Sequence, residues 1–177
     1  MGGKQCPVRR AIGDDKGFTL FEVLVVMAIM GILMTLAIIS FSDMRQRQLL
    51  ERQTKGIYAD IQSGRLRAIQ RGVDEFVSLQ NPAACRIFED TGDTFFSAAT
   101  DSLVSDYSLV PPYTMVLSNA AVTLVQFSPK GMVSEITPTV SIRVVPSVEG
   151  TYDCVTIEVA KTVLGKWDDT TKTCIIK

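Results

Sequence analysis

A long apolar segment near the N-terminal end places the strongest limit on how this 177-residue chain can fold. From residue 18 to residue 41 the only charged side chain is Glu22, and residues 23–39 are interrupted only by one glycine and one threonine. As a helix, residues 23–39 would be about 25 Å long at ~1.5 Å per residue, close to the thickness of a bilayer's hydrocarbon core once the preceding turn is added. The sequence therefore predicts a helix that is apolar on every side and carries one carboxylate at its start.

Three interpretations of this segment compete. A buried core helix is disfavoured because the run is long and apolar on every face, and a cleaved secretory signal is disfavoured because the run is longer than usual and no Ala-x-Ala site follows it. A retained membrane anchor fits its length, but a charge at the centre of a membrane helix costs roughly 2.5–3.5 kcal/mol, so Glu22 needs a partner. Cleavage after Gly17 would supply one. The new amine of Phe18 would lie four residues from Glu22 on one helix face, and could pair with it in the same chain or in a neighbouring copy.

The motif at this point, Gly17-Phe18-Thr19-Leu20-x-Glu22 behind a leader with four basic residues, resembles the class III signal of type IV prepilins and type II secretion pseudopilins. The resemblance implies cleavage between Gly17 and Phe18 by a prepilin peptidase, N-methylation of Phe18, and a role for Glu22 in the register of filament assembly. It also implies a single-pass inner-membrane protein in contact with lipid, with its head in the periplasm. After processing, that protein would join other pilin or pseudopilin subunits in a pseudopilus or pilus.

Beyond the apolar segment the chain becomes polar but keeps a helical period. One face collects apolar side chains at helical spacing, namely Leu50, Ile57, Ile61 and Ala68, widened by Tyr58 and Ile69. No proline occurs between Phe18 and Pro82, and Gly56 and Gly64 each weaken a helix by only about 1 kcal/mol relative to alanine. We expect one continuous helix from Phe18 to about Arg71, with its second half packed on a globular head.

From residue 73 the apolar period changes to two, which is typical of strands. The expected strands are residues 73–79, 85–88, 114–117, 122–127, 140–145, 154–159 and about 163–167, and residues 90–112 are expected to form an exposed loop. The predicted fold is α+β, a long N-terminal helix packed on an antiparallel β-sheet head. Its expected parts are a cleaved leader (1–17), a transmembrane or filament-core helix (18–41), an amphipathic second half of the helix (42–72) and a β-rich head (73–177).

Two short motifs in the second half of the chain carry a narrower resemblance. Arg67-Ala68-Ile69-Gln70-Arg71 at the expected helix end and Phe127-Ser128-Pro129-Lys130-Gly131 in the head are similar to motifs of the GspH/FimT type of minor pseudopilin. The second motif also predicts a β-turn in its own right, with Pro129 at the second position and Gly131 at the fourth.

The cysteines are expected to be structural. Cys6 would be lost with the leader, and no Cys-x-x-Cys pair suggests a zinc or thioredoxin-like site. We expect Cys154 and Cys174 to form a disulfide that closes the last strands, in preference to a pairing with Cys85. Cys85 would then be buried and free, or would bridge another subunit.

The composition argues against catalysis. The chain contains no histidine, which excludes Ser-His-Asp and Cys-His mechanisms and removes the commonest zinc ligand. We therefore expect no enzymatic activity, no cofactor and no metal site, and we interpret Asp168 and Asp169 as a solvated turn rather than a calcium site.

Binding to DNA is a further alternative. Some FimT-like proteins bind DNA through a Gly-Arg-x-Arg element near the C-terminus, and the corresponding stretch here is Gly165-Lys166-Trp167-Asp168, where an acid replaces the second basic residue. Residues 73–177 hold 7 basic and 13 acidic side chains, a net charge of −6 that disfavours binding to a polyanion. Lys161, Lys166 and Lys172 are the candidates for weak DNA binding. The alternatives to a filament subunit are thus a FimT-like DNA-uptake pilin and a plain membrane-anchored periplasmic protein.

Overall fold

The computed structural model describes residues 17–92, 95–133, 139–146 and 152–176, and of residues 36–40 only the helical backbone. The chain divides into two units, residues 1–41 and 42–177. Helix α1 (Leu20–Arg71) extends through both units, which confirms the predicted continuous helix. The predicted leader falls on residues 1–16, which lie outside the described part of the chain, and on Gly17.

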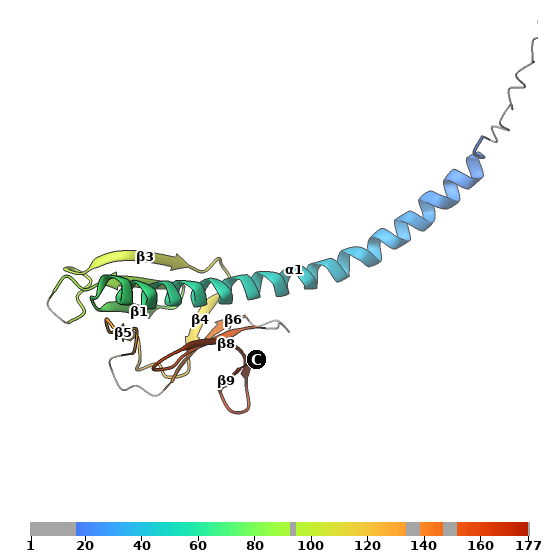
Figure 1. The fold of residues 1–177 in the computed structure, drawn as a ribbon. Helices are drawn as coiled ribbons and strands as arrows, with labels where there is room; N and C mark the ends of the chain where they lie inside the picture. The colour runs from blue at the N-terminus through green and yellow to red at the C-terminus, as the bar shows by residue number, and fades with distance from the viewer. Residues whose placement is uncertain (1–16, 93–94, 134–138, 147–151, 177) are drawn as a thin grey trace, which may run out of the picture. The chain divides into compact units, whose positions relative to one another are not determined.

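Nine described strands form two antiparallel sheets in the second unit (Figure 1). The four-stranded sheet has the order β3-β2-β1-β5 and consists of β1 (Glu75–Asn81), β2 (Ala84–Glu89), β3 (Ser102–Ser108) and β5 (Leu124–Phe127). The five-stranded sheet has the order β4-β6-β7-β8-β9 and consists of β4 (Thr114–Leu117), β6 (Val140–Val145), β7 (Cys154–Ile157), β8 (Thr162–Asp168) and β9 (Thr173–Ile176). The predicted α+β class is confirmed.

The second half of α1 supplies the centre of the head's core. Its predicted apolar stripe is fully buried together with side chains of both sheets, and consists of Leu50, Ile57, Ile61 and Ala68. Tyr58 packs against this core as expected, but Ile69 is half exposed and instead covers the backbone of Gly131. The turn that contains Gly131 is the predicted one, since its N–H donates to the Ser128 carbonyl at 2.7 Å and its φ is +72°.

Both glycines in this half of the helix lie under side chains of the four-stranded sheet. A Cβ atom on Gly56 would overlap the phenol ring of Tyr107 in β3, and one on Gly64 would lie 3.1 Å from Ile87 Cδ1 in β2. From the sequence, these glycines were expected only to weaken the helix slightly. The structure shows that they bring the helix close to the sheet.

Two strands were not predicted. The expected loop at residues 90–112 contains β3, and β9 follows the last expected strand. Both are edge strands with one neighbour each, so the side chains of β3 and β9 alternate only between partial burial and exposure. A strand of this kind lacks the strong apolar alternation that reveals a half-buried strand.

Candidate functional site

The N-terminal motif lies where α1 begins. Gly17, Phe18 and Thr19 precede the helix, and the Thr19 side-chain Oγ1 accepts a hydrogen bond from the Glu22 N–H at 3.2 Å. The Thr19 carbonyl also accepts from the N–H groups of Glu22 and Val23, at 3.1 and 3.3 Å. Thr19 is therefore the N-cap residue, and Thr-x-x-Glu is the spacing of a capping box. The Thr-x-x-Glu spacing in the sequence is a signal that could have predicted this cap.

The side chains that follow the cap are all exposed within their unit. Every described side chain from residue 18 to residue 35 is exposed, and Phe18 keeps 82% of its surface. Phe18, Glu22, Val26 and Met30 follow one another at steps of four, so the carboxylate lies on an apolar face. Apolar surface in this amount, on every side of one helix, requires a cover that this unit of the chain does not supply.

Within the described part of the chain, no helix reaches the length and apolar character needed to cross a membrane. Part of the predicted 18–41 segment, the side chains of residues 36–40, lies outside the described residues, as does Cys6.

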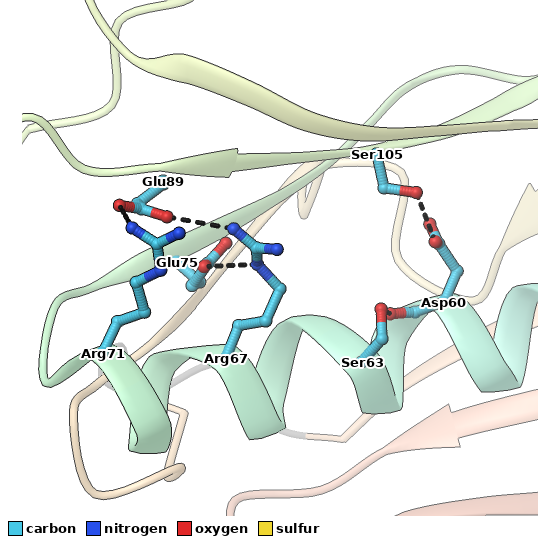
Figure 2. Close-up of polar contacts among 7 residues, drawn as sticks. All are labelled: Asp60, Ser63, Arg67, Arg71, Glu75, Glu89 and Ser105. Atoms are coloured by element: carbon cyan, nitrogen blue, oxygen red, sulfur yellow. Dashed lines mark hydrogen bonds and ion pairs between the residues drawn. The ribbon is translucent and has the colours of Figure 1, made fainter.

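The arginines at the end of α1 join the helix to the four-stranded sheet (Figure 2). Arg67 Nε contacts Glu75 Oε1 of β1 at 3.3 Å, and its Nη2 contacts Glu89 Oε2 of β2 at 3.1 Å. Arg71 Nη1 contacts the other oxygen of Glu89 at 3.2 Å. Glu75 is fully buried, and this burial raises its pKa while the neighbouring guanidinium of Arg67 opposes the rise. The motif at residues 67–71 thus has a structural role in this fold.

A second polar contact lies closer to the N-terminal end of α1 than the arginines do. Asp60 Oδ1 accepts a hydrogen bond from Ser105 Oγ at 2.6 Å, which ties α1 to the edge strand β3 (Figure 2). Burial raises the pKa of Asp60, while hydrogen bonds from Ser105 and Cys85 oppose the rise. Burial also raises the pKa of the Cys85 thiol, and Cys85 is buried and free, as one of the two predictions for it stated. A buried thiol with a raised pKa is a poor nucleophile.

Comparison with known proteins bears on both units. Residues 13–38 match a family model described as the prokaryotic N-terminal methylation motif. Two crystal structures of the type IV minor pilin FimU from Pseudomonas aeruginosa, in space groups P21 and P65, are similar to the chain with TM-scores of 0.52 and 0.51. The alignments cover 68% and 66% of this chain and 91% and 92% of the FimU chains.

The chain therefore has a pilin-like fold, and its N-terminal segment matches the methylation motif. Sequence identity to the two FimU structures is 12% and 13%, so that likeness concerns the fold alone. No curated protein matches the sequence.

The pilin-like head contains the predicted disulfide. Cys154 of β7 and Cys174 of β9 are bonded, with their Cα atoms 5.9 Å apart. Gly165 of β8 lies between them, paired with Cys154 on one side and with Ile176 on the other. A Cβ at Gly165 would meet Cys174 Sγ at 2.7 Å, so the absence of a side chain leaves room for the bridge.

The three candidate DNA-binding lysines are spread along β8. Lys161 lies before its first residue and pairs with Glu158 at 3.4 Å, whereas Lys172 lies in the turn after its end. Seven strand residues span roughly 23 Å, so these two ends are far apart, and the exposed Lys166 lies between them. The described residues therefore do not gather the three ammonium groups into one patch.

The acidic pair at the end of β8 behaves as a turn. Asp168 accepts hydrogen bonds from the Thr170 N–H and the Thr171 hydroxyl, and Asp169 pairs with Arg143. Within the described ranges, no group of three or more histidine, cysteine, aspartate or glutamate residues is placed to hold a metal ion.

Proposed function

We propose that the chain is a minor pilin or minor pseudopilin, a structural subunit of a type IV pilus or a type II secretion pseudopilus. It is made as a precursor in the inner membrane, with its head in the periplasm. Prepilin peptidase cuts it between Gly17 and Phe18, and the new Phe18 amine is methylated. The first half of α1 then packs among the corresponding helices of other subunits. This role is structural and needs no catalytic residue or cofactor.

One observation carries the proposal. Within the segment that matches the methylation motif, residues 13–38, a capped helix begins at Leu20, and all its described side chains up to residue 35 are exposed. A soluble monomer rarely exposes so large an apolar surface, so other molecules must cover it. Lipid before assembly and sister helices after assembly would both do so.

Glu22 gives this packing a register. A carboxylate on an apolar face is costly to bury unless a positive charge meets it. The amine that cleavage creates at Phe18 supplies such a charge at the same end of a neighbouring helix. Two helices would then fit side by side only when amine and carboxylate are level.

The alternatives have less support. A DNA-uptake role would draw on the three lysines around β8, which are spread over its length in a head of net charge −6. A plain membrane anchor would require neither Gly17 nor Glu22.

The first test is the mass of the N-terminal peptide of protein purified from membranes. The proposal expects a peptide that begins at Phe18 and carries one additional methyl group. A peptide that begins at Met1, or beyond Ser40, would remove the main support for a filament subunit.

The second test compares Glu22→Val and Glu22→Gln with Glu51→Gln, a matched change on the same helix. The subunit role expects both Glu22 variants to be cleaved but to be lost from sheared filaments, while Glu51→Gln is incorporated normally. A plain anchor expects all three variants to remain in the membrane as the unchanged protein does.

A further inference from the structure

The outer face of the four-stranded sheet carries a small cavity that the proposed assembly role does not use. Along β1, Val77 and Leu79 point into the core, so Phe76 and Ser78 point to the other face. On that face the ring of Phe96, from the segment between β2 and β3, packs against Phe76 and Phe88 with centroids 5.5 and 5.2 Å apart. The aromatic cluster holds Phe96 over the sheet, and Phe88 and Phe96 of this cluster line a partly open cavity of about 220 Å³.

Polar groups with free hydrogen-bonding capacity line one side of this cavity. Ser78 and Arg86 are direct cross-strand partners, and Gln80 lies two residues further along β1 on the same face. Arg86 Nε donates to Asp106 Oδ2 at 3.1 Å, which leaves its two Nη atoms without a partner among the described residues. The side chains of Ser78 and Gln80 likewise form no hydrogen bond within the described ranges. Phe88 and Phe96 supply the aromatic part of the lining.

The chemistry of these groups selects a ligand. A guanidinium edge presents two parallel N–H donors in the geometry that a carboxylate accepts, and a hydroxyl and an amide add further donors. The aromatic rings suit a flat apolar group of about one ring. The volume lies below the range of roughly 300–1,000 Å³ that is usual for drug-sized ligands, so the site has room for one group of amino-acid size.

We propose that this cavity binds a carboxylate that carries one aromatic side chain. Arg86, Ser78 and Gln80 hold the carboxylate, and Phe88 and Phe96 hold the ring. Asp106 competes with the ligand for Arg86. The C-terminal residue of a polypeptide and a free aromatic acid share this chemistry.

The test uses the full chain in detergent micelles with labelled alanine methyl groups, because Ala84 and Ala98 line the cavity. The probe is N-acetyl-phenylalanine, and its neutral carboxamide is the matched control. We expect saturable shifts of both methyl signals with a dissociation constant of roughly millimolar, as a ligand of this size allows, and at least about tenfold weaker binding of the carboxamide.

Three variants assign the site. Arg86→Gln should weaken binding of the acid at least about tenfold, and Asp106→Asn should tighten it, a gain that misfolding cannot produce. Arg143→Gln removes a head arginine on the other sheet and should change nothing. Equal binding of acid and carboxamide, no binding of either, or no effect of Arg86→Gln would overturn the proposal. Tighter binding of acetyl-Gly-Gly-Phe than of 3-phenylpropionate assigns the site to polypeptide C-termini, and the reverse order assigns it to free acids.

Discussion

The close approach of α1 to β3 makes Gly56 the most informative position for a stability measurement. Gly56→Ala should raise the intrinsic helix stability by about 1 kcal/mol, because glycine is a poor helix former. The added Cβ, however, would lie 2.7 Å from Tyr107 Cε2 and closer still to the phenol oxygen, so Tyr107 must move away. Overpacking of this kind costs typically 1–3 kcal/mol. We therefore expect a net loss of about 1 kcal/mol in the free energy of unfolding.

The assay is urea unfolding of the full chain in detergent, followed by the fluorescence of Trp167, the only tryptophan in the sequence. Gly56→Ala should lower the midpoint without changing the denaturant slope. Gly64→Ala is the matched control. Its Cβ would lie 3.1 and 3.3 Å from two carbon atoms of Ile87, which need to move only a few tenths of an ångström, so gain and loss should nearly cancel.

A double-mutant cycle separates the two contributions to the Gly56 effect. In a Tyr107→Ala background the steric cost is absent, and Gly56→Ala should stabilise the head by up to about 1 kcal/mol. The sign of the effect is thus expected to reverse between the two backgrounds. Gly56→Ala could instead stabilise the unchanged chain, or destabilise the head in both backgrounds. Either result would show that the close packing of Tyr107 on the helix is not the reason for glycine at position 56.

Three further predictions concern the head. Cys174→Ser opens a bridge across a sequence separation of 20 residues and should cost about 3 kcal/mol, and dithiothreitol should destabilise the unchanged chain by a similar amount but leave the variant unaffected. Because burial raises the folded-state pKa of Asp60 above its ordinary value of 3.8, its ionised form opposes folding, so the unchanged chain should gain stability relative to Asp60→Asn as the pH falls from 7 toward 4. The prediction is contradicted if the free energies of unfolding of the two proteins, measured by urea titration, change by the same amount across that pH range. Gly131→Ala should cost roughly 1–2 kcal/mol, because φ is +72° and the new Cβ would lie 2.5 Å from Ile69 Cδ1. Adding Ile69→Ala should restore the steric part of that loss but not the backbone part.

The sequence predicted those helices and strands in which the spacing of apolar residues follows burial on one side. The helical spacing of apolar residues was enough to predict the buried stripe from Leu50 to Ala68, and the strands at 114–117 and 140–145 lie at the predicted residues. β3 was missed because an edge strand does not need to alternate strongly. Ile69 was assigned to the core because spacing alone cannot show that the helix face ends at residue 68. Its apolar side chain covers a turn instead.

For the candidate site, the sequence predicted interactions between residues that are close together in the chain, but not interactions between distant segments. The motif at residues 17–22, with Glu22 at its end, was recognised from six residues of sequence, and the cap formed by Thr19 could have been recognised from the same residues. The pairs that Arg67 and Arg71 form with Glu75 and Glu89 depend on where β1 and β2 lie against α1. No spacing along the chain predicts that arrangement.

The two halves of α1 differ in where their partners are found, and this difference is the strongest argument about how the chain works. In the second half, the stripe of Leu50, Ile57, Ile61 and Ala68 is buried by the chain's own sheets. Gly56 and Gly64 leave room for side chains of the four-stranded sheet. In the first half, up to residue 35, the described side chains are all exposed although they are more apolar. Apolar surface of this size is unfavourable in water. Since the chain's own fold covers the apolar stripe of the second half, we infer that the first half is covered by other molecules. Under the proposed function, the folded head is the surface that the subunit presents, and the exposed half of the helix is the surface through which it assembles.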